Sequence, residues 1–359
     1  MPRNLSDALI GVLRDVTKGG EDVLARGQQQ REIRGHVQTI ARPNERVLIL
    51  PGRANNIFAQ IAETAWVMAG RDDMDFLVRY LPRAAEFSDD GRRWRAAYGP
   101  RLRSWGGKVD QCAEVVARLQ EDPFTKRAAM SIFDPGVDYC DTLDVPCNNW
   151  LHFLQRKNQL HTSVAVRAND AIWGFSGINV FEWSVLQELI ASSIGADVGE
   201  MHWYVGSMHV YDRHYRVAEK ILRNPNPLSV YDFGVRPLPI TTSIAGLDEV
   251  LDTFMRAEAR ARVGDYTSAA EEIDDPFFSA SLTMLNAYNM LLNDCGHGRI
   301  IEELAKLPES DLRLAAVEYL TRRTDTDFGR ELSLTPRERG FLAHHVRVSS
   351  EVSLTTSVA

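Results

Sequence analysis

The chain has 359 residues, of which 44% are hydrophobic and 25% are charged, an ordinary composition that excludes disorder of the whole chain. Its 49 acidic residues outnumber its 41 basic ones, giving a formal net charge of −8. This balance argues against a protein that coats nucleic acid or an anionic membrane, so no nucleic-acid partner is expected. The length allows one large domain or two ordinary ones.

Four cysteines are too few for a disulfide scaffold, and none belongs to a Cys-x-x-Cys pair. We therefore predict a reduced, cytoplasmic protein with no metal site. The first twenty residues have neither a long apolar core nor a small-residue cleavage site, and no run of about 18 apolar residues follows. We expect no leader and no membrane partner.

Apolar periodicity predicts a helix over residues 4–25. Residues 45–51 resemble a short buried strand, and residues 57–69 a mostly buried helix. The stretch 84–107 is rich in Arg, Asp and Gly, which predicts an irregular connection.

Strands are predicted over 127–134, 161–167 and 202–210, with a strong helix over 180–195. A proline-rich connector follows at 224–239. These elements predict an α/β (α+β) part that ends near residue 243.

From residue 244 to 345 nearly every segment has helical periodicity, and the last residues resemble a frayed tail. We therefore divide the chain into a catalytic domain, 1–243, a helical C-terminal extension, 244–345, and a flexible tail, 346–359.

One set of motifs gives meaning to Cys147, because a lone cysteine is most often a small buried hydrophobe. The motifs are, in chain order, Ala62-Glu63-Thr64-Ala65-Trp66, Pro146-Cys147-Asn148, Arg167-Ala168-Asn169-Asp170, Gly174 with Asn179, and Gly206-Ser207-Met208-His209-Val210-Tyr211. In this order they resemble the thymidylate synthase superfamily over residues 20 to 240. The resemblance implies a thymidylate synthase-like fold whose mixed sheet forms a dimer interface, and hence a homodimer with shared active sites.

The chemistry of the superfamily explains these residue types. Carbon C5 of a pyrimidine is a poor nucleophile until a thiolate adds to C6. The resemblance makes Cys147 that thiolate, a pyrimidine nucleoside monophosphate the substrate and 5,10-methylenetetrahydrofolate the one-carbon donor. A thiolate near neutral pH needs positive charge beside it. Arg167 matches the arginine that supplies this charge and also grips the substrate phosphate.

By the same resemblance, Arg26 holds phosphate within the subunit, while Lys126 and Arg127 reach across from the partner subunit. The alternative for these residues is solvated surface. Glu63 matches the acid that organises water and moves protons to the base, the alternative being a paired structural acid. Tyr98 matches the tyrosine that helps remove the C5 proton, the alternative being packing.

Four further residues are carried over from the family. Asp170 matches the aspartate that binds the pterin ring of folate, with a helix cap as its alternative. Asn179 matches the reader of the base edge. His209 and Tyr211 match the groups that bind the sugar hydroxyl. The alternative for these three is a satisfied polar group at the end of an element.

The departures from methylating members favour another product. Asn148 follows the cysteine where those enzymes have histidine, and hydroxymethylases share the Pro-Cys-Asn pattern. Ala84 and Phe87 fall where methylating enzymes place two tryptophans, with Trp94 nearby but out of register. If water reaches the exocyclic methylene intermediate, a hydroxymethyl group forms in place of methyl.

Two positions, Ala168 and Asn179, bear on the sugar and the base of the substrate. Ala168 replaces a serine that lies by the phosphate and sugar, which favours a ribonucleotide, although drift compensated by Lys126 is an alternative. Asn179 fits thymidylate synthases, but an asparagine amide can face uracil or, flipped, cytosine. The spacing from Gly174 to Asn179 is one residue longer than in methylating members.

The first hypothesis is therefore a CMP 5-hydroxymethylase, which resembles those of nucleoside-antibiotic biosynthesis. The same chemistry on dCMP or dUMP comes next. A thymidylate synthase and a non-catalytic nucleotide-binding protein are the remaining alternatives.

Overall fold

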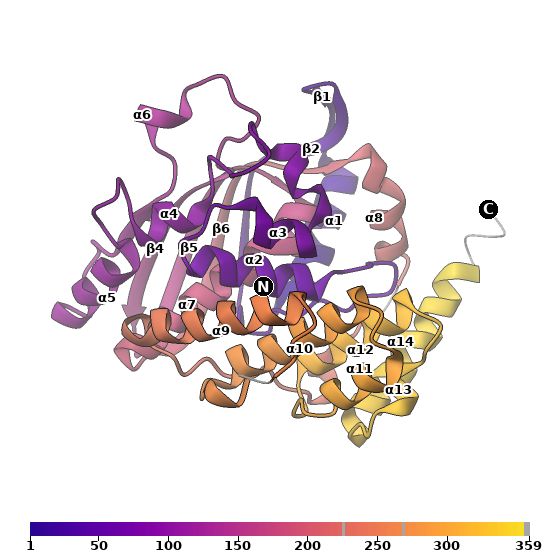
Figure 1. Ribbon diagram of the computed structural model, residues 1–359. Coiled ribbons are helices and arrows are strands. Elements are labelled where there is room, and N and C mark those ends of the chain that lie inside the picture. The colour runs from indigo at the N-terminus through magenta and orange to yellow at the C-terminus, as the bar shows by residue number, and fades with distance from the viewer. Residues whose placement is uncertain (225–226, 268–269, 355–359) are drawn as a thin grey trace.

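The computed structural model describes residues 1–224, 227–267 and 270–354, with side chains through residue 350. A mixed sheet has helices packed on one face, and the C-terminal helices form a further layer beneath them (Figure 1). This confirms the predicted α/β (α+β) class with a helical C-terminal extension. None of the described helices combines the length and the apolarity needed to cross a bilayer.

The six-stranded sheet has the order β1-β2-β6-β5-β4-β3. Its strands are β1 (Glu21–Ala25), β2 (Gln28–Ile40), β3 (Ala129–Ser131), β4 (Asn148–Arg156), β5 (Gln159–Asp170) and β6 (Asp197–Tyr211). Neighbouring strands are antiparallel except β5 and β6, which are parallel. A parallel pair needs a long crossover, and here the crossover contains the central helix α7 (Val180–Ile194). The site residues on β5 and β6 therefore meet at one end of the sheet.

The other helices before residue 243 surround this crossover. They are α1 (Leu5–Gly19), α2 (Ile57–Met68), α3 (Met74–Tyr80), α4 (Tyr98–Arg103), α5 (Gln111–Glu121), α6 (Pro135–Asp138) and α8 (Tyr215–Leu222). Short 3-10 turns are η1 (Pro82–Phe87), η3 (Asp212–His214), η4 (Val230–Phe233), η5 (Ile244–Gly246) and η6 (Ala270–Glu272), and η2 (Ala171–Asn179) is a π-helix.

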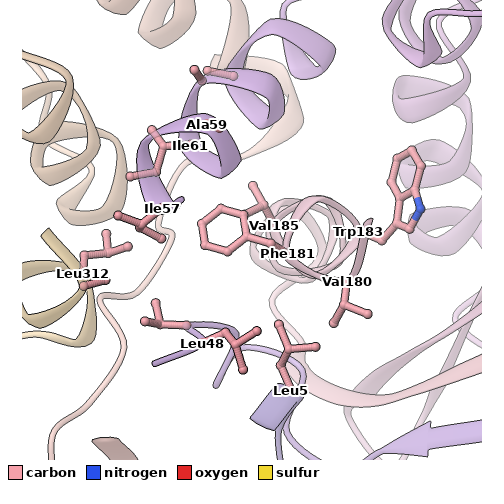
Figure 2. Close-up of a cluster of buried hydrophobic side chains, with 14 of the residues drawn as sticks. Leu5, Leu48, Ile57, Ala59, Ile61, Val180, Phe181, Trp183, Val185 and Leu312 are labelled. Carbon is pink, nitrogen blue, oxygen red and sulfur yellow. The ribbon is translucent and has the colours of Figure 1, made fainter. Parts of the chain in front are cut away.

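Helix α7 is enclosed on all sides. Every residue from Val180 to Ala191 is buried, as expected for a helix without a polar face. Figure 2 shows Phe181 of α7 directed towards Ile57 of α2, while Trp183 points the opposite way. The helix thus lies between the sheet and α2.

Most predicted elements are confirmed, but the predicted strand at 45–51 is wrong. That segment is buried yet forms only an isolated bridge between Leu50 and Arg53. The backbone N–H of Val47 donates to the hydroxyl oxygen of Tyr231 at 3.0 Å, so a side chain replaces a ladder partner. An apolar run looks the same in sequence whether it is buried as a strand or as coil.

Two other segments differ in extent from the predictions. The helix predicted over 4–25 ends at Gly19, because Gly20 is extended and β1 starts directly after it. The stretch 84–107, predicted to be irregular, contains part of η1 and all of α4. Residues 225 and 226 of the predicted connector lie outside the described residues, and η4 forms within the rest of it.

The helices predicted over 244–345 are present. They are α9 (Leu247–Arg262), α10 (Pro276–Leu292), α11 (His297–Leu304), α12 (Asp311–Arg323), α13 (Phe328–Glu331) and α14 (Pro336–Leu354). Helix α14 continues to Leu354, so the segment expected to be a flexible tail from residue 346 is helical up to that point. Residues 355–359 lie outside the described residues, and the domain boundary at residue 243 stays a prediction.

The extension packs on the face of α2 that points away from α7. The ring of Phe58 on α2 stacks on Tyr288 of α10 at 4.8 Å and meets Tyr319 of α12 edge-on at 5.1 Å. All twelve residues of α2 are buried as a result. One continuous hydrophobic cluster therefore joins the sheet and its helices to the extension.

A polar contact between α3 and the extension gives a stability test. Buried Tyr80 donates its hydroxyl hydrogen to Glu258 and accepts a hydrogen bond from Asn289 Nδ2 at 2.8 Å. We expect Tyr80→Phe to lower the free energy of unfolding by about 1–3 kcal/mol, because both partners lose a hydrogen bond while buried. Urea denaturation measures the change, with exposed Tyr139→Phe as the control. Equal effects of the two variants would show that the hydrogen bonds of Tyr80 do not stabilise the fold.

Candidate active site

Several of the predicted site residues lie where β5 and β6 end. Cys147 directly precedes β4, and Arg167, Ala168 and Asp170 lie at the end of β5. The parallel register pairs Asp170 with His209, so the ends of the two strands meet. Tyr211 is the last residue of β6.

Cys147 and Arg167 are held against each other. The Arg167 Nη2 atom lies 3.6 Å from the Cys147 Sγ atom. The guanidinium also donates to the carbonyl oxygens of Pro146 at 2.9 Å and Val145 at 2.8 Å. The backbone N–H of Arg167 donates to the carbonyl oxygen of Cys147 at 2.9 Å. Main-chain contacts thus fix the arginine beside the thiol before any ligand binds.

Burial raises the pKa of the Cys147 thiol, while the charges of Arg167 and Arg26 oppose this shift. Arg26 reaches the cysteine from the tip of the β1–β2 hairpin, where Arg26 and Gly27 both have positive φ. Lys126 and Arg127 are exposed, and no described contact joins them to the thiol. Within one chain the positive charge does not outweigh desolvation of the thiolate.

Tyr98 is oriented by a relay that includes Asn148. The indole Nε1–H of Trp183 donates to Asn148 Oδ1 at 3.1 Å, and Asn148 Nδ2 donates to the Tyr98 hydroxyl oxygen at 2.8 Å. An indole only donates, so the direction of the relay is fixed. The Tyr98 hydroxyl hydrogen therefore points to another acceptor. Burial is the main cause that raises the pKa of Tyr98, and the nearby Cys147 thiol adds to it.

Glu63 faces a second buried acid that sequence analysis missed. Burial raises the pKa of Glu63 to about 8. Glu182 on α7 is completely buried, and burial together with Glu63 raises its pKa well above the usual range. Within the described residues, neither oxygen of Glu182 nor Oε2 of Glu63 has a hydrogen-bond partner. The signal for Glu182 was available, because it too is an acid inside an apolar run.

Asp170 acts as a helix cap, the alternative weighed above. Its carboxylate accepts hydrogen bonds from the backbone N–H groups of Ile172 and Trp173, both at 3.1 Å. One carboxylate oxygen also lies 3.6 Å from His214 Nδ1. The cap starts η2, and the folate-binding role stays a prediction.

Asn179 is the last residue of η2 and is nearly buried. Its Oδ1 accepts a hydrogen bond from Asn169 Nδ2 at 3.0 Å. A π-helix contains one more residue per hydrogen-bonded turn than an α-helix. The long spacing from Gly174 to Asn179 therefore falls within a π-helix, and Asn179 lies at the start of α7.

His209 and Tyr211 meet edge to face, with ring centroids 4.9 Å apart. His209 Nδ1 lies 3.3 Å from the carbonyl oxygen of Ser207, and the Arg213 guanidinium lies 4.1 Å from the centre of the Tyr211 ring. Burial lowers the pKa of His209 and raises that of Tyr211. Both rings are thus fixed in place, with a neutral imidazole at neutral pH.

Trp94 is used for packing. Its ring meets Trp66 edge-on at 5.7 Å, and its indole N–H donates to the carbonyl oxygen of Ala84 at 3.0 Å. Ala84 is completely buried and Phe87 is largely exposed. Trp94 therefore packs on Trp66 and donates its indole N–H to the main chain of Ala84.

A second group of polar residues lies away from this site. The side chains of His161, Glu200 and His202 lie close enough together to hold a cation. His161 is nine residues before Asp170 on β5, about 30 Å along the strand. Its Nδ1 accepts a hydrogen bond from the backbone N–H of Glu200 at 3.2 Å, so a neutral ring carries its proton on Nε2. That tautomer cannot offer Nε2 as a metal ligand.

Comparison with known proteins agrees with this geometry. Residues 9–241 match the thymidylate synthase family. The chain belongs to the thymidylate synthase family. The match covers the sheet, α7 and every predicted site residue, and it ends where the helical extension begins.

Three phage proteins are among the similar relatives, each named deoxyuridylate hydroxymethyltransferase. The protein of Bacillus phage SP01 is 37% identical over 58% of this chain and 58% of its own length. The protein of Delftia phage PhiW-14 is 34% identical over 60% of each chain. The protein of Pseudomonas phage M6 is 29% identical over 79% of this chain and 82% of its own length. The chain thus spans about three fifths of the first two relatives.

Burial of Glu63 has a measurable cost. Its pKa is about 8 in the folded protein and near 4.5 in the unfolded chain. Between these values the unfolded state releases a proton that the folded state keeps, so the wild type loses stability as pH rises. We expect Glu63→Gln to gain stability relative to the wild type from pH 5 to pH 8, by roughly 1.4 kcal/mol per pH unit.

Denaturant unfolding at several pH values measures this difference. Glu249→Gln, on the exposed part of α9, is the control for loss of a surface carboxylate. A gap between Glu63→Gln and wild type that stays constant over this pH range would show that Glu63 is ionised in the folded protein.

Proposed function

We propose that this protein is a folate-dependent pyrimidine nucleotide 5-hydroxymethylase. The observation that carries the proposal is the cluster of Cys147, Arg167 and the relay-bound Asn148 at the ends of β4 and β5. The thiolate of Cys147 adds to C6 of the pyrimidine, and C5 then bonds to the one-carbon unit. Loss of the C5 proton and release of tetrahydrofolate from the one-carbon unit leave an exocyclic methylene at C5. Water adds to this methylene, Cys147 leaves C6 as a thiolate while the C5–C6 double bond forms again, and the proton lost by the water restores the thiol.

5,10-Methylenetetrahydrofolate supplies the one-carbon unit in this proposal. The Asp170 carboxylate fits the N–H donors of a pterin, because each oxygen accepts one backbone N–H and keeps a second lone pair. Glu63 and Glu182 are buried and their raised pKa values keep them protonated, which suits a group that exchanges protons with the base and with water. Asn148 orients the Tyr98 hydroxyl, which accepts the C5 proton in this proposal.

Hydroxymethylation is favoured over methylation by two features. Asn148 is committed to Trp183 and Tyr98, where methylating enzymes carry histidine. Trp94 packs on Trp66, and Ala84 adds no ring beside the intermediate. The names of the three phage relatives agree with this product.

CMP is the first candidate substrate. Ala168 favours a ribonucleotide, with drift compensated by Lys126 as the alternative, and the choice of cytosine rests on the resemblance to CMP hydroxymethylases. Ala168 is partly exposed at the end of β5, so the missing hydroxyl leaves space beside the sugar. A second candidate is dUMP, which the names of the phage relatives favour. Asn179 also agrees with uracil, since it matches the residue of thymidylate synthases.

A homodimer completes the proposal. On the sheet face without packed helices, Val37 and Tyr204 are exposed large side chains, and Trp150 is partly exposed. A second copy of the chain would bury this face and could bring its own Lys126 and Arg127 to the phosphate. These cations would also help to lower the pKa of the Cys147 thiol.

Mass spectrometry tests the activity. The protein is incubated with methylenetetrahydrofolate and an equal mixture of CMP, dCMP, UMP and dUMP. Gain of CH2O on one nucleotide is the expected result, while gain of CH2 on dUMP would mean a thymidylate synthase. We expect Cys147→Ser to abolish turnover and keep nucleotide binding, with exposed Cys140→Ser as the matched control. Full activity of Cys147→Ser would contradict the covalent mechanism.

The sugar preference depends on Ala168. We expect Ala168→Ser to shift kcat/KM towards deoxynucleotides by about tenfold, since an added hydroxyl occupies space and forms one hydrogen bond. The ratio of CMP to dCMP turnover measures this shift. Ala165→Ser on the same strand is the control, and a ratio that Ala168→Ser leaves unchanged would refute the role of this position.

A further inference from the structure

A chain of buried hydrogen bonds ends at the amide of Asn179. The indole Nε1–H of Trp203 on β6 donates to Asn169 Oδ1 at 3.2 Å, and Asn169 Nδ2 donates to Asn179 Oδ1 at 3.0 Å. Trp203 is completely buried, Asn169 is 2% exposed and Asn179 is 7% exposed. Water therefore has little access to these groups and cannot readily replace any of these hydrogen bonds.

The donors and acceptors in this series of hydrogen bonds can be assigned in only one way. An indole N–H can donate but not accept, so Asn169 must turn its oxygen to Trp203. Its Nδ2 group then faces Asn179, which must accept the hydrogen bond with its Oδ1 atom. The Asn179 Nδ2 group is left on the other side, where the Glu182 carboxyl lies beside it. A flipped Asn179 amide would set two NH2 groups against each other and leave both buried donors unpaired.

The backbone is shaped around this pair of amides. A Cβ atom at Gly174 would lie 2.5 Å from Asn169 Nδ2 and 3.4 Å from Asn179 Oδ1. Glycine is therefore required where η2 passes the pair. The π-helix then brings Asn179 back to the amide of Asn169 at the start of α7.

We propose that Trp203 and Asn169 determine which pyrimidine base the site accepts, by fixing the orientation of the Asn179 amide. Uracil presents a donor at N3 and an acceptor at C4, whereas cytosine presents an acceptor and then a donor. A free amide can turn over to serve both, but a fixed amide matches one. Trp203 and Asn169 are positioning residues, and the inference rests on the proposed function, in which Asn179 faces the base.

Asn169→Asp tests the orientation with almost no change of shape. An ionised carboxylate only accepts, so it takes hydrogen bonds from both Trp203 Nε1–H and Asn179 Nδ2. The Asn179 amide must then turn over. We expect the ratio of dissociation constants for UMP and CMP to move at least tenfold towards the base that the wild type disfavours. A protonated carboxyl could still donate to Asn179, so the shift should grow between pH 6 and pH 9.

Trp203→Phe is the second variant. It removes the donor that orients Asn169 and keeps most of the buried ring volume. Both amides can then turn over together, so we expect the preference between the bases to fall towards unity. Phe175→Leu is the matched control, because Phe175 packs edge-on against Trp203 at 5.5 Å while the Trp203 N–H donates to Asn169. It should keep the wild-type preference.

Calorimetric titration with UMP, CMP, dUMP and dCMP, without folate, measures these ratios independently of turnover. Circular dichroism confirms that each variant is folded. A wild type that prefers one base, together with folded variants that keep its ratio, would overturn this inference alone. A wild type that binds both bases equally would also overturn it. A wild type that binds no pyrimidine nucleotide would overturn the proposed function, and the inference with it.

Discussion

The complete enclosure of helix α7 is the constraint on which the rest of the site depends. A helix without a solvent face leaves each of its polar side chains to find a partner or stay uncharged. Gln187 gives its amide to the carbonyl oxygens of Leu160 and Gly199, and Glu188 forms an ion pair with buried Arg46. Glu182, with no such cation, responds by a raised pKa. At the start of α7, Asn179 contacts Asn169 and Glu182 lies near Glu63. Enclosure of the helix therefore sets the hydrogen bonding of Asn179 and the protonation of Glu182.

The C-terminal extension contributes to this enclosure. It packs on α2 through Phe58, and all twelve residues of α2, Glu63 among them, are buried. Desolvation is the cause of the raised pKa of Glu63. The extension also reaches the segment before α2, where Arg322 donates to the carbonyl oxygen of Asn55 at 2.7 Å. In the same segment Arg53 donates to the carbonyl oxygen of Ile172 in η2 at 2.9 Å. These contacts link the extension to the π-helix, so it supports the site without supplying one of its predicted residues.

Local sequence patterns predicted the buried helices and identified the motifs of the site, because both depend on neighbours along the chain. The patterns failed where the partner is distant. The segment 45–51 has the composition of a strand, but Tyr231 takes the place of a pairing strand. Strand β2 went unpredicted, since polar Gln30, His36 and Gln38 are buried in it while apolar Val37 is exposed, which removes the expected alternation. The bond between Asn169 and Trp203 joins residues 34 positions apart, and no spacing rule connects them.

In the proposed function, the two tryptophan relays belong to recognition, and the thiol to activation. Trp183 orients Asn148 and Tyr98, and Trp203 orients Asn169 and Asn179, so donors and acceptors are arranged before a nucleotide arrives. Such preorganisation lowers the cost of binding and of the transition state. The thiol is treated differently, because burial keeps the pKa of Cys147 raised despite two nearby arginines. In the proposed function, recognition is therefore built into the single chain, whereas full activation of Cys147 needs further positive charge, which a second copy of the chain would provide.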